Sequence, residues 1–220
     1  MQIFKRVISY IIFCTLLTPF VHSANIIQHS KKQCIPHESI TTVELNKADQ
    51  KWFENSFVET FLNGYKPLTF NVGPKENPKT LGPNDTEDKR KFLEETAKEE
   101  FENYVVNPKE SYVGIKILVD GKPAGAILLR LIRNGKIIYL ARLFICEEFA
   151  RKGLATYVLK NELRKKFPGY KRYEVLTRYE NRAGNALNKR LQYTEDKSGK
   201  IAEFYGYNPE RYMGFYKEFE

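Results

Sequence analysis

Six residues near the middle of the chain, Ala150 to Ala155, have the types and spacing of an anion-binding turn. They read Ala-Arg-Lys-Gly-Leu-Ala, follow an apolar run and open a segment with helical spacing. A helix start presents unpaired N–H groups and the positive end of the helix dipole, so the cations Arg151 and Lys152 are unfavourable there unless an anion binds between them. Gly153 lets phosphate oxygens approach the backbone closely. The turn predicts a phosphate site, with a plain solvated turn as the alternative.

Length, composition and charge limit the classes of protein that fit. The chain has 220 residues, of which 42% are hydrophobic and 14% aromatic, which excludes a disordered chain and suggests one domain with extensions. The formal net charge of +9 falls to +7 without Lys5 and Arg6 of the N-terminal segment. This modest excess favours anionic ligands or surfaces and does not by itself indicate nucleic acid.

The N-terminal residues have the pattern of a secretory signal peptide. Two basic residues precede an apolar run that is short for a membrane span, and Val21 and Ser23 are the small residues of a cleavage site. We expect residues 1–23 to be removed, with an uncleaved anchor as the alternative. The mature protein is then exported, to the periplasm or out of the cell, with no membrane span left. Residues 24–38 are expected to form a polar tail before a domain at 39–220.

Cysteine and histidine residues are too few and too scattered to predict a metal site. Apart from Cys14 in the signal peptide, the cysteines are Cys34 and Cys146, and no cluster has metal-ligand spacing. Cys34 and Cys146 can pair after export. However, Cys146 ends an apolar strand, where a cysteine often serves as a small buried hydrophobe, so the disulfide stays open.

The first half of the chain is predicted to form one strand and two helices. β-Branched residues alternate over 39–45, which predicts a strand. Residues 48–65 carry aromatic residues at three- and four-residue spacing, which predicts an amphipathic helix. Residues 66–85 contain four prolines and are expected to form a long loop. Residues 86–105 begin with a threonine and two acids and predict a second helix.

Turn signals and apolar periodicity predict the rest of the fold. Asp120-Gly121 and Asn134-Gly135 separate three apolar runs, and such dipeptides are the strongest short hairpin signals, so three antiparallel strands are expected at 112–120, 122–133 and 136–146. A helix, a strand, a helix and two final strands are expected at 154–167, 170–179, 182–192, 201–207 and 211–219. The resulting order, β-α-α-β-β-β-α-β-α-β-β, indicates a mixed α/β fold.

This order and two segments resemble the GNAT superfamily of acetyl-CoA-dependent N-acetyltransferases. The segments are "YLARLFICEEFARKGLATYVL" and "YENRAGNALNKRLQY", and the resemblance covers residues 39–220. The family's phosphate-binding pattern is Arg or Gln, two residues, Gly, one residue, then Gly or Ala. Gly153 and Ala155 match it, whereas Ala150 stands where Arg or Gln is expected. The resemblance implies a mostly antiparallel sheet flanked by helices, and transfer of an acetyl group from acetyl-CoA to an amine.

The resemblance also implies which residues bind the cofactor. In the family, the strand before the turn is bulged and splays from its neighbour, and its free backbone groups hold the pantetheine arm and the acetyl carbonyl. A later asparagine often lies near the cofactor arm, and a helix cap is its alternative role here. The implied cofactor-binding residues are Phe144, Ile145 and Cys146 in the strand, Arg151, Lys152, Gly153, Leu154, Ala155 and Thr156 in the turn, and Asn181.

The catalytic acid and base have several candidates. The family often has a tyrosine seven residues after this asparagine that protonates the leaving thiolate, but Asn188 stands there and cannot act as an acid. The leaving thiol resembles a free cysteine, with a pKa of about 8.5, and needs little help. The amine must lose a proton to a carboxylate or through water. The candidates, each with a surface or packing role as the alternative, are Glu147, Glu148, Tyr179, Tyr205 and Tyr207.

Three functions of different classes fit the sequence. The first is an N-acetyltransferase that uses acetyl-CoA as co-substrate and acts on a small-molecule or protein amine. The second is a catalytically silent CoA-binding module, which Ala150 and Asn188 favour. The third is an exported basic protein that binds an anionic partner. Because exported spaces hold little CoA, the first function implies delivery into another cell or an incorrect export prediction.

Overall fold

The computed structural model describes residues 34–219 except 66, 73–78, 133 and 135. The predicted signal peptide and most of the predicted tail lie outside the described residues. The described residues belong to one unit of the chain. None of its described helices is long and apolar enough to span a membrane.

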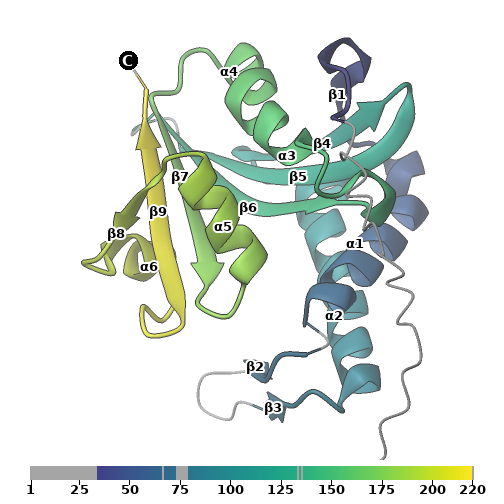
Figure 1. The fold of residues 1–220 in the computed structure, drawn as a ribbon, viewed down its shortest axis with the longest axis vertical. Helices are drawn as coiled ribbons and strands as arrows, with labels where there is room; N and C mark the ends of the chain where they lie inside the picture. Colours follow the sequence, from purple (N-terminus) through teal and green to yellow (C-terminus); the bar gives the residue numbers. More distant parts are fainter. Residues whose placement is uncertain (1–33, 66, 73–78, 133, 135, 220) are drawn as a thin grey trace, which may run out of the picture. The chain divides into compact units, whose positions relative to one another are not determined.

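The main sheet of the described residues has seven strands in the order β1-β4-β5-β6-β7-β9-β8 (Figure 1). Neighbouring strands are antiparallel except β6 and β7, which run parallel. The predicted class, a mixed and mostly antiparallel sheet flanked by helices, is therefore confirmed. The strands are β1 (Ile40–Glu44), β4 (Tyr112–Val119), β5 (Lys122–Ile132), β6 (Ile137–Ile145), β7 (Arg172–Arg178), β8 (Thr194–Asp196) and β9 (Tyr212–Glu218).

The three central strands are the ones that the turn dipeptides predict. Asp120 and Gly121 both have positive φ, 50° and 73°, which the tight turn between β4 and β5 requires. β4, β5 and β6 then pair in sequence as an antiparallel meander. The meander places the end of β6 beside the predicted anion-binding turn.

Helices cover both faces of the sheet (Figure 1). One face, here called the α1 face, carries α1 (Gln50–Tyr65) and α2 (Thr86–Phe101). The other, the α5 face, carries α5 (Arg182–Arg190) and one continuous helical segment of α3 (Leu154–Tyr157), a π-helical turn (Val158–Glu162) and α4 (Leu163–Lys166). The two faces are defined by the buried clusters that these helices share with the sheet.

The two apolar clusters follow the period of two along the strands. Leu128 of β5 belongs to the cluster under α1 and α2, whereas its neighbour Leu129 belongs to the cluster under the helices of the α5 face. The α1 cluster is rich in aromatic rings and includes Phe53, Phe57, Leu93, Phe101, Leu128 and Phe144. The α5 cluster is mostly aliphatic and includes Ile117, Leu129, Leu140, Leu154, Val158 and Leu191.

The prediction of a strand at 201–207 is wrong. Residues Lys200–Phe204 form helix α6, which packs against β9 and β7 on the α1 face. Asp196 Oδ2 accepts a hydrogen bond from Ile201 N at 2.7 Å and so satisfies one of the amides that open this helix. The penultimate strand of the fold is instead the short β8 just before it.

The predicted loop at 66–85 contains two short strands. β2 (Phe70–Val72) and β3 (Lys79–Leu81) pair antiparallel as a small separate sheet. The helix predicted at 86–105 is present, but its last turn, Glu102–Val106, is π-helical. Both features depend on tertiary contacts and leave the predicted order of the main elements unchanged.

Candidate active site

The parallel strands β6 and β7 separate part of the way along their length (Figure 1). Their register joins Ile137–Leu140 to Arg172–Val175 and goes no further. The register of β6 against β5 also shifts just after Leu140, which makes Ala141 a bulged residue. Beyond this bulge, the facing edges of β6 and β7 no longer pair with each other. We call this feature the splay.

The three residues predicted at the end of β6 point their backbone groups in two directions. Cys146 N donates to Ala124 O at 2.9 Å, so the Cys146 amide is used within the sheet. Amides alternate along an antiparallel ladder, so that of Phe144 also points toward β5, and that of Ile145 points toward the splay. The Phe144 side chain is only 3% exposed beneath α1. Of the three, only Ile145 presents its backbone N–H to the splay, and the role of all three in cofactor binding stays a prediction.

The turn after β6 carries a run of open backbone N–H groups, here called the amide cradle (residues 151–156). Within the described chain, none of these six amides makes a backbone hydrogen bond of standard geometry, although Ala150 and Arg151 form a tight turn that directs the Lys152 amide back toward the chain. The first helical hydrogen bond runs from Tyr157 N to Gly153 O at 3.0 Å. Gly153 has a φ of 86°, and an added Cβ would meet no atom within 4 Å. The cradle therefore has the donors and the open approach that phosphate oxygens need.

Arg151 and Lys152 flank the cradle with exposed cationic side chains. Arg151 has a φ of 61°, a left-handed conformation that costs a non-glycine residue about 1–2 kcal/mol. Strain of this kind persists where the surrounding structure imposes it and is concentrated at ligand sites. The backbone of Ala150 is extended, and its N–H donates to Glu147 O at 3.1 Å. Its side chain is a methyl group, so it adds no polar contact where the family pattern has Arg or Gln.

The two asparagines of the α5 region have structural partners. Asn181 Oδ1 accepts from Gly184 N at 2.9 Å and caps α5, as its alternative role predicts. Asn188 is 3% exposed and donates from Nδ2 to Thr177 Oγ1 of β7 at 2.9 Å. Asn188 thus ties α5 to the strand that forms one side of the splay, and it supplies no acidic proton.

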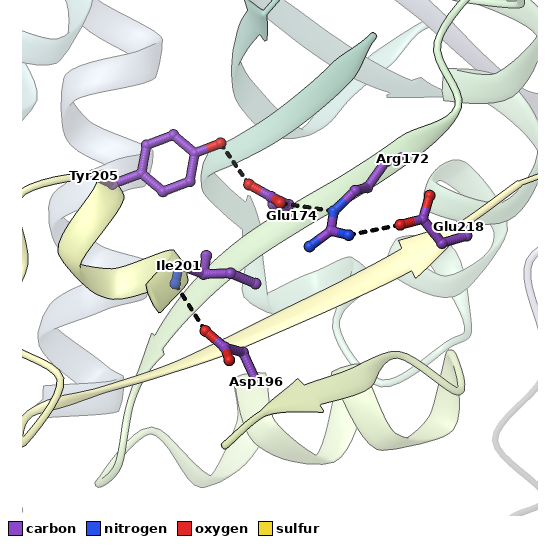
Figure 2. A network of polar contacts seen from close by, with 6 residues as sticks. All are labelled: Arg172, Glu174, Asp196, Ile201, Tyr205 and Glu218. Carbon is purple, nitrogen blue, oxygen red and sulfur yellow. Dashed lines mark hydrogen bonds and ion pairs between the residues drawn. The ribbon is translucent and has the colours of Figure 1, made fainter. Parts of the chain in front are cut away.

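Tyr205 lies in a network of polar contacts on the α1 face (Figure 2). Its hydroxyl donates to Glu174 Oε2 at 2.8 Å, and Glu174 Oε1 accepts from Arg172 Nε at 2.7 Å. Arg172 also binds Glu218 at 2.6 Å. Burial raises the pKa of Tyr205, and the hydrogen bond to the Glu174 carboxylate raises it further. This predicted candidate for the acid is therefore held protonated against a carboxylate.

Tyr207 is partly buried, whereas the other three predicted acids and bases, Glu147, Glu148 and Tyr179, lie on the surface. Glu147 and Glu148 are exposed in the 3-10 turn that follows β6. Tyr179 is 51% exposed, and its hydroxyl donates to Pro209 O at 3.3 Å. None of these contacts gives the residue a second group that would activate it for proton transfer.

Two carboxylates on the α1 face were not predicted from the sequence. Glu100 of α2 binds Arg142 of β6 at 2.7 Å, and Glu174 of β7 belongs to the network of Figure 2. Burial lowers the pKa of Arg142, but the Glu100 carboxylate and three neighbouring tyrosines together outweigh this effect, and the net shift is upward. No sequence signal marks Glu100, because α2 carries several acids and only the tertiary structure selects one.

The two cysteines in the described part of the chain are free thiols. Cys34 is exposed and Cys146 is half-buried, where burial raises the pKa of its thiol. Across the described residues, no group of three or more His, Cys, Asp or Glu side chains is placed to hold a metal ion.

Known structures share this fold. The chain is similar to the PaiA N-acetyltransferase from Thermoplasma acidophilum in complex with coenzyme A, with 16% identity and a TM-score of 0.56 over 82% of this chain and 99% of that chain. It is also similar to an acetyltransferase from Salmonella typhimurium that modifies the N-terminal serine of ribosomal protein L7/L12, with 14% identity and a TM-score of 0.55 over 84% and 99%. At these identities the likeness shows the fold.

A third similar structure is the microcin C7 self-immunity acetyltransferase in complex with acetyl-CoA and AMP, with 18% identity and a TM-score of 0.52 over 83% of this chain and 93% of that chain. No curated protein sequence matched. A model of the acetyltransferase (GNAT) family matches residues 81–193, more than half of the chain, and includes the splayed strand and the cradle. The protein therefore belongs to the GNAT family and is an acetyltransferase.

Proposed function

We propose that the protein transfers an acetyl group from acetyl-CoA directly to a primary amine of a small molecule or a protein. One observation carries the proposal: the splay between β6 and β7 opens next to the amide cradle. The splay offers unpaired backbone groups to a ligand arm that contains amides. The cradle offers N–H groups to a diphosphate. Family membership and the similar structures that contain coenzyme A or acetyl-CoA support this assignment.

The residues present fit this co-substrate. The open amides of 151–156 would bind the diphosphate, and Arg151 and Lys152 would add charge-assisted hydrogen bonds. The backbone of Ile145 faces the splay and would donate to the oxygen of the acyl group. Bound acetyl-CoA supplies a thioester carbonyl to the amine.

The chain's own contribution to the reaction is mainly positioning and hydrogen bonding. The Ile145 N–H would stabilise the negative charge that develops on the acyl oxygen as the amine nitrogen attacks. Glu100 and Glu174 are both held by arginines, so we assign removal of the amine proton to water. The leaving thiol has a pKa of about 8.5 and departs without a strong acid, which is consistent with Asn188 and with the engaged hydroxyl of Tyr205.

Substitution of Gly153 tests the cradle. Gly153→Asp places a carboxylate beside the proposed diphosphate, and we expect the affinity for acetyl-CoA, measured by calorimetry, to fall at least tenfold. Gly121→Asp is the matched control, because Gly121 has a similar φ of 73° and equally open surroundings in the hairpin between β4 and β5. Equal affinities for the two folded variants would contradict the assignment of the cradle.

Turnover separates an enzyme from a binding module. We expect release of free CoA thiol when acetyl-CoA and a panel of primary amines are added to the full chain. Tight acetyl-CoA binding without thiol release would favour the catalytically silent module. Salt-sensitive binding to DNA or anionic vesicles without affinity for acetyl-CoA would favour the basic binding protein.

We also propose that residues 1–23 are removed on export, to the periplasm or outside the cell, with delivery into another cell as the route to acetyl-CoA. The proposal rests on the basic start, the short apolar run and the small residues before position 24. The intact mass of the protein recovered from its producing cells tests it, since a chain that keeps residues 1–23 contradicts removal.

A further inference from the structure

Arginine and tyrosine side chains gather on the α1 face beside the splay. We call them the arginine–tyrosine cluster, and its seven members come from five elements and the segment after α6: Tyr65, Arg130, Tyr139, Arg142, Arg178, Tyr207 and Tyr212. All except Tyr139 are partly exposed. The catalytic machinery described above uses none of them.

The alternation along the strands places these residues on one face. Leu129, Leu140 and Phe215 pack in the cluster of the α5 face. Side chains one residue away therefore point to the α1 face, as Arg130 and Tyr139 do. Arg142 pairs in register with Leu128, which packs in the α1 cluster.

The same alternation holds on β7. Thr177 binds Asn188 of α5 and so points to the α5 face, which places its neighbour Arg178 on the α1 face. Arg178 is the last residue of β7, on the part of the strand that no longer pairs with β6.

Direct contacts join the members of the cluster. The Arg178 guanidinium lies 5.2 Å from the ring centre of Tyr212, and the Tyr212 ring lies 4.8 Å from that of Tyr207. Arg130 lies 5.7 Å from the ring centre of Tyr139. Tyr207 is within electrostatic range of both Arg130 and Arg142. The contacts thus form one group on β5 and β6 and a second on β7 and β9, with Tyr207 of the second group close enough to influence both Arg130 and Arg142.

Positive charge in the cluster is not balanced. Arg142 is paired with Glu100, and Glu174 on the same face is paired with Arg172. Among the described residues, no carboxylate lies within ion-pair distance of Arg130 or Arg178. Toward the described residues, the Arg130 guanidinium makes one hydrogen bond, from Nε to the hydroxyl of Tyr104 at 3.1 Å, and the Arg178 guanidinium contacts only aromatic rings. Two guanidinium groups therefore keep most of their donors free.

This charge selects among amines. A substrate whose only charge is ammonium is repelled by two unpaired arginines, and it finds no free carboxylate in the cluster. A carboxylate or phosphate on the substrate matches the planar fork of an arginine and forms paired, charge-assisted hydrogen bonds with it.

We infer that the acceptor of the proposed transfer reaction is an amine that also carries an anionic oxygen group, a carboxylate or a phosphate, and that Arg178 binds this group. The inference rests on the proposed function and names its class of acceptor. Arg178 lies beside the splay and is the main determinant. The surrounding tyrosine rings offer a surface for the rest of the acceptor.

Binding in the presence of coenzyme A tests the inference without requiring turnover. The probes are matched pairs of amines that differ only in the anionic group: tyrosine with tyramine for the carboxylate, and phosphoethanolamine with ethanolamine for the phosphate. We expect the anionic member of at least one pair to bind the full chain at least tenfold more tightly. The pair that shows the difference identifies the anionic group. Equal affinity within both pairs, or tighter binding of the members that lack the anionic group, overturns the inference.

Variants of Arg178 assign the effect to this residue. Arg178→Gln is expected to reduce the affinity for the anionic probe about tenfold, and Arg178→Lys to restore part of it, with coenzyme A affinity unchanged in both. Arg164→Gln is the matched control, because Arg164 also stacks on a ring, 4.7 Å from the centre of Phe219, but lies on the α5 face. An equal loss in Arg164→Gln would mean that net charge alone is responsible and would overturn the assignment.

The two proposals fail in different ways. If acetyl-CoA neither binds nor releases thiol, the proposed function fails. The affinities within each matched pair of amines still show whether the protein prefers the anionic member. If thiol release is fast with ethanolamine or tyramine and no anionic probe binds better, the transfer function stands and the inferred class of acceptor is wrong.

Discussion

For the candidate acids and bases, the hydrogen-bond partner of each side chain distinguishes a catalytic role from a structural one. Tyr205 and Asn188 occupy positions where an acid is sought, yet each is engaged with another side chain, Glu174 and Thr177 respectively. The ring of Tyr205 also stacks on Tyr139, with centroids 3.8 Å apart. Such partners follow from tertiary contacts, so the sequence shows the candidate residue types without showing which hydroxyl is free.

Tyr205→Phe tests whether this tyrosine positions α6 or donates a proton. We expect the free energy of unfolding to fall by about 1.5–3 kcal/mol, because the buried Glu174 carboxylate loses a hydrogen bond. The rate of thiol release should remain within a few fold of that of the unmodified protein. Tyr179→Phe is the control for loss of an exposed hydroxyl, with an expected change within about 0.5 kcal/mol. A hundredfold loss of rate with unchanged stability would identify Tyr205 as the acid.

Among the elements, α6 shows why local pattern reading fails in short segments. The segment from 201 to 207 contains three aromatic residues, a residue type that is enriched in strands. In the structure, the adjacent residues Ile201 and Ala202 are both buried, which a helix allows and a half-exposed strand does not. Gly199, with a φ of 74°, starts the helix. The decisive information is the Asp196 side chain, which satisfies the opening amide from five residues away in sequence.

Asp196→Ala therefore tests what holds α6 in place. The Asp196 carboxylate accepts from Ile201 N and from Ser198 N at 3.0 Å, so its removal should lower the free energy of unfolding by about 1 kcal/mol. Glu195→Ala, an exposed acid next to it, is the control and should change stability little.

Burial raises the pKa of Asp196, but its hydrogen bonds outweigh this and the net shift is downward. The difference between the variants should thus be present above pH 3.8 and vanish as the pH falls below it. Equal stabilities in urea titrations at neutral pH would contradict this role.

For the whole molecule, the sequence predicts the architecture better than the site. The Asp-Gly turn and the long apolar runs fix the central meander, and the glycine turn at 150–155 marks the end of the splayed strand, because both are encoded by neighbouring residues. Which β6 amides point to β5 and which to the splay depends on the register of the strands. The arginine–tyrosine cluster brings together residues from elements far apart in the chain. Neither can be read from spacing along one segment.

Buried tyrosines give the molecule a common response to alkaline pH. Burial raises the pKa of Tyr104 to about 12, although its hydrogen bond with Arg130 opposes the rise. Burial also raises the pKa of five other tyrosines: Tyr139, Tyr173, Tyr193, Tyr205 and Tyr212. The folded state then keeps protons that the unfolded chain loses above about pH 10, so stability is full below this pH and falls as the pH rises further.

Urea unfolding at several pH values, with tyrosinate absorbance recorded in parallel, measures this effect. The free energy of unfolding should decline between about pH 10 and pH 12, and Tyr104→Phe should decline less steeply. A stability that is constant over this range would show that these hydroxyls ionise in the folded protein as freely as in the unfolded chain.

The short pairing of β6 with β7 has a consequence for how the sheet is completed. Only four residue pairs connect an antiparallel half made of β1, β4, β5 and β6 to a second half made of β7, β9 and β8. Besides the outer edges at β1 and β8, the sheet therefore has two inner edges, on β6 and β7, that face each other without hydrogen bonds between them. We therefore expect a ligand arm with peptide-like amide groups to lie between β6 and β7, to form the missing hydrogen bonds there, and so to connect the two halves of the sheet as a strand would.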